Sequence, residues 1–397
     1  MVSGVLLKRA ALFLAVVCAA ILTSCGSSNN SSTTVSNFKD RALYDNTESG
    51  GAYILNIDTV PPTPFASASA SLVTPEQMYR SADRSLVLIY DDAAFSISVF
   101  NSAQETVTST LNLDYHSESI EMSSDAKRAY AAVPNNPELN APPGAVLSFD
   151  LTTGNAGAQI AVPGARRIAL SGDNNTLLVF ADNDNSVYYI DLTATTLKAV
   201  AVSGFNHPYT AYFSSDNATA YVLNCGTECS GTVAPSVQPL ALSTTAQTAG
   251  TAVPVPGATV GYLNGTTLYV AGNDLTQPAG QQGVMTTLNV SNMTVTGTTA
   301  IADGLHNKIA AYSNKLWIGS GTCTTSNCLS IVDLTANTAT IGTTTGNVTG
   351  FAPAPSSGWM YVMQGGQLYQ YDPNALSTPT MPIDIVGQGW DIKLLDQ

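Results

Sequence analysis

A net charge of −14, from 28 acidic and 14 basic residues among 397, sets the first limits on this chain. Nucleic acids and anionic lipid surfaces attract proteins with a basic face, so both are poor partners. Only 11% of the residues are charged, and Thr, Ser, Asn and Gly are abundant. Together with strand-favouring Val, Thr, Ile and Tyr, this composition is typical of an exported β-rich protein. The length allows one to three domains.

The N-terminal segment, residues 1–24, has the pattern of a secretory signal. Positive charge precedes an uncharged run, Ala10–Thr23, which is shorter than the ~20 residues of a membrane-spanning helix. The run ends in Leu22-Thr23-Ser24-Cys25, which resembles the lipobox of bacterial lipoproteins. That resemblance implies cleavage before Cys25, lipid on its sulfur and stable attachment to a membrane. A soluble secreted protein with a chance cysteine here is the alternative.

The segment after the lipobox is expected to be a flexible tether. Residues 25–51 are rich in Ser, Asn, Thr and Gly and hold too few apolar side chains to offset the entropy of ordering. Gly26 follows Cys25, and an Asp there would signal inner-membrane retention in some bacteria. The lipoprotein resemblance therefore implies the outer membrane. The folded domain is expected over residues 52–397.

A repeated pattern fills this domain. In its clearest copy, a Ser171-Gly172-Asp173 turn precedes an apolar strand ending at Phe180, and a second strand, Val187–Asp191, follows. The equivalent turn positions are Asp83, Asp125, Asp173, Asp216, Asn264, Asn314 and Ser357, which lie 42 to 50 residues apart. This spacing fits four strands a unit. We therefore predict an all-β fold, a seven-bladed β-propeller of four-stranded antiparallel blades.

Two further strands are expected outside the seven units, at Ala52–Asp58 and Trp390–Leu395. Terminal strands of this kind can complete one sheet and leave no open edge. An eight-bladed ring that shares a blade between both termini is the alternative. The stretch Val179–Gly204, with its Asn-rich turn and Val-x-x-Ile-Asp strand, resembles the YVTN-type, WD-like propeller repeat. The resemblance spans roughly residues 75–386 and implies a fold more than a function.

Four cysteines of the predicted domain form two close pairs, each placed after a strand and before its hairpin partner. The pairs are Cys225 with Cys229 and Cys323 with Cys328. In an exported protein such pairs predict disulfides, here shaping loops at the propeller rim. A four-thiolate metal site is the alternative, but its cysteines are usually separated by two residues rather than three or four.

The three histidines occupy equivalent positions in alternate units. His116 and His207 lie nine residues before their turn positions, and His306 lies eight before. Imidazoles converging on the central channel could hold zinc or copper. Alternatively, each histidine caps its own blade or is a tolerated loop residue. Arg166-Arg167 at a blade mouth could contact an acidic ligand.

The sequence contains no nucleophile elbow, phosphate-binding loop or zinc-protease motif. We therefore predict no catalytic residues and no cofactor. The expected protein is a monomeric lipoprotein of the cell envelope, whose propeller binds or scaffolds a protein or glycan partner. The alternative function is a metal-dependent, lactonase-like hydrolase with its site at the channel mouth.

Overall fold

The computed structural model describes residues 35–59, 61–67, 72–136, 143–181, 184–243, 246–376, 379, 381–385 and 387–396. The signal segment and the lipid-bearing Cys25 predicted above lie outside these residues. In the described part of the chain, the helical structure is one short 3-10 turn, η1 (Gly226–Cys229). None of it forms a helix long and apolar enough to cross a membrane.

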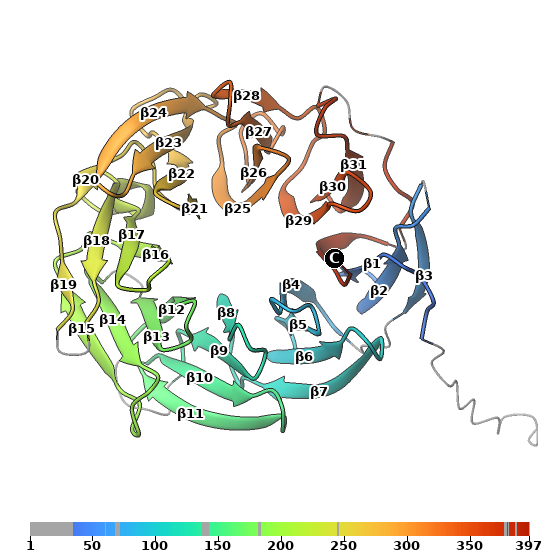
Figure 1. Ribbon diagram of the computed structural model, residues 1–397, viewed down its shortest axis with the longest axis horizontal. Helices are drawn as coiled ribbons and strands as arrows, with labels where there is room; N and C mark the ends of the chain where they lie inside the picture. Colours follow the sequence, from blue (N-terminus) through green and yellow to red (C-terminus); the bar gives the residue numbers. More distant parts are fainter. Residues whose placement is uncertain are drawn as a thin grey trace, which may run out of the picture. The chain divides into compact units, whose positions relative to one another are not determined.

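The seven predicted units form seven antiparallel sheets that follow one another around a ring (Figure 1). In chain order they are β4–β7 (Pro75–Arg80, Leu86–Asp91, Ser96–Asn101, Thr106–Asn112), β8–β11 (Ser119–Met122, Arg128–Val133, Ala145–Asp150, Asn155–Ala161), β12–β15 (Ala165–Leu170, Thr176–Ala181, Ser186–Asp191, Ala199–Ser203), β16–β20 (Pro208–Phe213, Thr219–Asn224, Ser236–Ala241, Thr248–Ala249, Val253–Pro254), β21–β24 (Val260–Asn264, Thr267–Asn273, Gly283–Asn289, Thr294–Ala300), β25–β28 (Leu305–Tyr312, Lys315–Gly321, Leu329–Asp333, Thr338–Ile341) and β29–β31 (Val348–Ala354, Trp359–Gln364, Gln367–Tyr371). The propeller prediction is confirmed.

An eighth blade closes the ring, so the preferred count of seven blades is wrong and the eight-bladed alternative is correct. Its order is β3 (Thr63–Ser67), β2 (Gly51–Asn56), β1 (Arg41–Asn46) and β32 (Gly389–Leu394). The C-terminal β32 is thus the innermost strand and pairs with the N-terminal β1. The folded domain also begins before residue 52, because β1 lies within the stretch expected to be a tether.

The turn between the first and second strands of a blade explains the repeated Ser-x-Asp pattern. Ser171 Oγ donates to Asp173 Oδ1 at 2.6 Å and accepts from the Thr176 backbone N–H at 2.9 Å. Asn174 takes a left-handed conformation, φ 61°, which Asn tolerates better than most residues. The pattern therefore has a structural role.

The hydrophobic core lies between neighbouring blades rather than within one. Second strands such as β13 are buried on both faces, which accounts for their continuous apolar runs. One cluster joins Leu88 and Ile97 of one blade to Ile120 and Phe149 of the next. Burying each such side chain is worth ~1.5–3 kcal/mol.

Consecutive strands of each blade run in opposite directions, so the loops between them lie alternately on two faces of the ring. All inner strands begin at one face, which we call the mouth face, and end at the other, the opposite face. Loops from second to third strands return to the mouth face, so both cysteine pairs lie there. The Ser-x-Asp turns lie on the opposite face. So does Arg41, which begins β1 and donates its backbone N–H to Asp396.

Candidate functional site

A cavity of about 400 Å³ lies at the centre of the ring, near the mouth face. Residues of six inner strands, or of the segments leading into them, supply its mostly polar and aromatic lining. They are Glu76, Gln77, Tyr79, His116, Ser117, Glu118, Ser119, Arg167, Tyr209, Thr210, Tyr212, Thr259, Val260, Leu305, Asn307 and Lys308. A concave site of this size with convergent polar groups is typical for binding a small ligand.

Arg167 is held in place on one wall of the cavity. Its guanidinium lies 3.8 Å from the centroid of the Tyr209 ring, and its Nη2 lies 3.6 Å from Glu118 Oε2. Glu118 also pairs with Arg166. A stacked cation of this kind gains ~0.5–2 kcal/mol. The two arginines that could contact an acidic ligand are therefore partly neutralised, and Arg167 is a pre-positioned hydrogen-bond donor.

More acidic side chains lie in and beside the β4–β7 blade, two blades along the ring from Arg167. The His116 imidazole contacts the Asp92 carboxylate, which also accepts a hydrogen bond from the Tyr90 hydroxyl at 2.7 Å. Glu76, on β4, is half-buried nearby. Burial and, secondarily, the charge of Asp92 raise the pKa of Glu76. This side of the cavity favours neutral or cationic groups.

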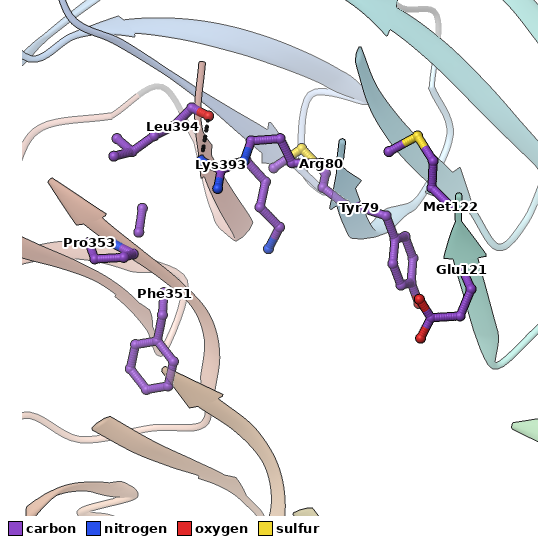
Figure 2. Close-up of a pocket in the computed structure, with 10 residues that line it drawn as sticks. Tyr79, Arg80, Glu121, Met122, Phe351, Pro353, Lys393 and Leu394 are labelled. Atoms are coloured by element: carbon purple, nitrogen blue, oxygen red, sulfur yellow. Dashed lines mark hydrogen bonds between the residues drawn. The ribbon is translucent and has the colours of Figure 1, made fainter. Parts of the chain in front are cut away.

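Tyr79 joins the central cavity to another of about 350 Å³ that extends toward the opposite face (Figure 2). Its hydroxyl donates to Gln77 Oε1 at 2.6 Å. Figure 2 shows the Tyr79 ring and the Glu121 carboxylate directed to the same part of this space. Glu121 has no hydrogen-bond or ion-pair partner among the described residues, and burial raises its pKa to about 7. Burial likewise lowers the pKa of Lys308.

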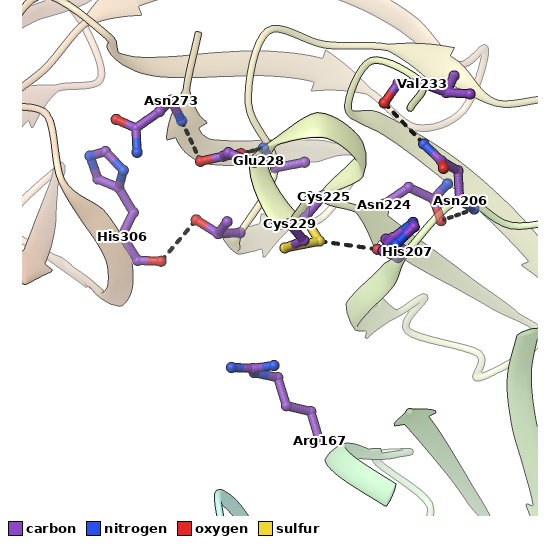
Figure 3. Close-up of a disulfide and its surroundings, with 12 residues drawn as sticks. Arg167, Asn206, His207, Asn224, Cys225, Glu228, Cys229, Val233, Asn273 and His306 are labelled. Atoms are coloured by element: carbon purple, nitrogen blue, oxygen red, sulfur yellow. Dashed lines mark hydrogen bonds between the residues drawn. A yellow bond between two sulfur atoms is a disulfide. The ribbon is translucent and has the colours of Figure 1, made fainter. Parts of the chain in front are cut away.

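Both predicted disulfides form, which confirms that interpretation of the cysteine pairs. The Cα atoms are 5.5 Å apart in Cys225–Cys229 and 5.7 Å apart in Cys323–Cys328. The first bond encloses η1 and thereby positions Glu228 (Figure 3).

Glu228 ties its loop to the next blade. Its carboxylate accepts the backbone N–H groups of Ala258 at 2.8 Å and Asn273 at 2.6 Å. Burial raises the pKa of this carboxyl to about 7, although both hydrogen bonds oppose the shift. Sequence reasoning missed this contact, as it missed Glu121, because a single acidic residue carries no signal of what it will meet.

The three histidines have three different environments. His116 lines the central cavity, and His207 accepts the Cys225 N–H through its backbone carbonyl at 3.0 Å. His306 is fully buried with Nε2 2.8 Å from the Ala302 carbonyl oxygen, and burial lowers its pKa to about 4. Within the described ranges, no three His, Cys, Asp or Glu side chains are grouped closely enough to hold a metal ion. The metal site at the histidines stays a prediction.

Comparison with known proteins supports the fold alone. No known protein family and no curated protein matches the sequence. Among solved structures, the chain is similar to dihydro-heme d1 dehydrogenase NirN in complex with DHE, at 11% identity and TM-score 0.67, covering 89% of this chain and 75% of that one. It is similar to the C-terminal WD40 domain of Sif2, at 8% identity and TM-score 0.61, covering 84% and 92%.

A third similar structure is a putative 6-phosphogluconolactonase from Bacteroides fragilis, at 13% identity and TM-score 0.54, covering 91% of this chain and 99% of that one. Folds of this kind carry many unrelated functions, so identities this low say nothing of activity. The likenesses establish a β-propeller with WD-type neighbours.

Proposed function

We propose that this chain is a lipid-anchored protein of the cell envelope, in the outer membrane, whose propeller binds a partner at the mouth of the central cavity. One observation carries the binding role: the cavity lining is polar and already ordered. Arg167 is stacked on Tyr209 and paired with Glu118, so little side-chain entropy remains to be lost on binding.

The proposed anchor is close in sequence to the folded domain. The first strand begins at Arg41 on the opposite face, and Cys25 precedes it by sixteen residues. The proposed lipid would therefore be joined to the propeller through the fifteen residues between Cys25 and Arg41.

The lactonase-like hydrolase is the weaker candidate. Its support is the likeness to a putative 6-phosphogluconolactonase, which at 13% identity is a likeness of fold. The described residues contain no grouped metal ligands on which a hydrolytic water could be activated.

The anchor is tested by labelling growing cells with radioactive palmitate. The wild-type chain is expected to take up label and to fractionate with membranes, whereas Cys25→Ala is expected to lose all label. Cys18→Ala is the matched control, because this cysteine lies within the predicted signal and would be removed with it. Absence of label in the wild type would end the lipoprotein proposal.

The binding role is tested with a non-lipidated Cys25→Ala chain immobilised and exposed to solubilised envelope proteins and glycans. Replacing both Arg167 and Tyr209 by Ala is expected to weaken retention of the bound species tenfold or more, as loss of buried anchor residues does. Lys127→Ala is the control, because Lys127 is exposed on the opposite face. Equal retention by the mouth variant, or no retained species at all, would overturn the proposed role.

A further inference from the structure

Another hollow, of about 420 Å³, opens on the mouth face, where the closing blade meets its neighbours. Its lining residues come from the closing blade, from the last repeat unit (β29–β31) and from the first repeat unit (β4–β7). The side chains that matter here are those of Trp390, Gln388, Glu76 and Asn347, and the Gly365-Gly366 turn also lines the hollow.

Trp390 is an exposed aromatic side chain on a rigid strand. It is 37% exposed, while Asp391 and Ile392, which follow it on β32, are buried. The backbone N–H groups of Trp390 and Asp391 both donate to the buried Asp45 carboxylate. Because the backbone is held in this way, the indole presents apolar surface at a defined position rather than on a mobile loop. Aromatic side chains used this way are characteristic of binding surfaces.

A turn without side chains also lines the hollow. Gly365 and Gly366 both take left-handed conformations, φ 58° and 78°, and connect β30 to β31 as a two-residue hairpin turn. Such a turn favours Gly at both positions. A Cβ on Gly366 would lie 3.4 Å from the Gln388 side chain. The turn therefore adds no side chain of its own to the hollow, and the Gln388 side chain lies against it.

The hollow is lined by polar atoms that make no hydrogen bond to the described residues. The Glu76 carboxylate makes no hydrogen bond or ion pair with the described residues. Asn347 accepts the Thr322 N–H through Oδ1 at 2.8 Å, and its amide N–H₂ has no such partner in the described part of the chain. The Gln388 amide is also unengaged there. The hollow thus combines one acceptor carboxylate with two amides, and no Lys or Arg lines it.

We infer that this hollow binds one ring of a neutral glycan, with the apolar face of the sugar on Trp390. The ring hydroxyls would donate to Glu76 and accept from the Asn347 and Gln388 amides. The volume is sufficient for a small ligand of this class. The Glu76 carboxylate lines the site, and no Lys or Arg does. Phosphorylated and nucleotide ligands are therefore disfavoured, because their negative charge would be repelled. The inference rests on the proposed binding role, and it narrows the partner of the propeller from a protein or glycan to a glycan.

The test uses the Cys25→Ala chain and a set of soluble probes, namely maltotriose and diacetylchitobiose as neutral glycans, choline as a cation and glucose 6-phosphate as an anion. Isothermal titration is expected to show saturable binding of at least one neutral glycan and no binding of glucose 6-phosphate. Trp390→Ala is expected to weaken that glycan tenfold or more, and Glu76→Gln several-fold. Trp359→Phe, a change outside the hollow, should leave its affinity unchanged.

Three results would overturn the inference: no saturable binding of either neutral glycan, unchanged affinity in Trp390→Ala, or tighter binding of choline than of the glycans. These outcomes are separate from the proposed role itself. If an envelope partner is retained through Arg167 and Tyr209 while no glycan binds at Trp390, the glycan site fails and the binding module stands.

Discussion

Replacing Arg41 by Ala is expected to lower the free energy of unfolding by about 3–5 kcal/mol, because it removes one partner of a buried ion cluster. The Arg41 guanidinium donates from Nε and Nη2 to the two oxygens of Asp396, each at 2.8 Å. Its Nη1 donates to Glu105 at 2.6 Å and to the Ser102 carbonyl at 3.0 Å. The Glu105 side chain is only 5% exposed, so its charge would lose this compensating cation where water is scarce.

The size of this effect follows from where the cluster lies. Arg41 begins the N-terminal strand, and Asp396 follows the C-terminal strand. Glu105 belongs to the neighbouring blade. The Arg41 side chain therefore links the two ends of the chain to each other and to that blade. Urea unfolding of Arg41→Ala and of Lys127→Ala measures the difference. Lys127 makes only an exposed contact with Asp125 at 3.6 Å, and its removal should change the stability by less than 1 kcal/mol. Similar losses in the two variants would refute a closing role for Arg41.

The same closure shows what the sequence could and could not predict about the fold. Seven blades were predictable because each carries its own turn chemistry, such as Ser171 with Asp173. The eighth has no such turn between its two inner strands, since β32 and β1 come from opposite ends of the chain. Arg41–Asn46 also follows a polar run, and pairing across more than 300 residues leaves no local pattern.

Some parts of the candidate site could be predicted from the sequence, and others could not. The cysteine pairs and histidines could be placed at the mouth, because their positions within the repeat define the face on which they lie. The stacking of Arg167 on Tyr209 and the hollow lined by Trp390 could not be predicted. Both depend on which side chains of separate blades converge, and that depends on the number of blades and the geometry of the ring.

The second large effect is a loss of stability as the pH rises, caused by Glu121. Burial raises the pKa of this carboxyl from its ordinary value of 4.5 to about 7 in the folded protein. Between these values the folded state binds a proton that the unfolded state has released. The stabilisation is therefore complete below about pH 4.5 and is lost as the pH rises through 7. A difference of this size corresponds to at most ~3 kcal/mol.

Comparing the wild type with Glu121→Gln isolates this contribution, because other groups titrate in both proteins. Asp45 acts in the same direction, since burial and the charge of Asp391 raise its pKa, whereas hydrogen-bonded surface carboxylates such as Asp83, with a lowered pKa, act in the opposite direction at low pH. Denaturant unfolding from pH 4.5 to 8 should show the wild type losing stability relative to the variant by up to ~3 kcal/mol. Parallel curves would mean that Glu121 has the same pKa in the folded and unfolded states, and therefore that burial does not raise it. At neutral pH the carboxylate facing Tyr79 would then add a negative charge to the cavity of about 350 Å³, and that cavity would favour cations.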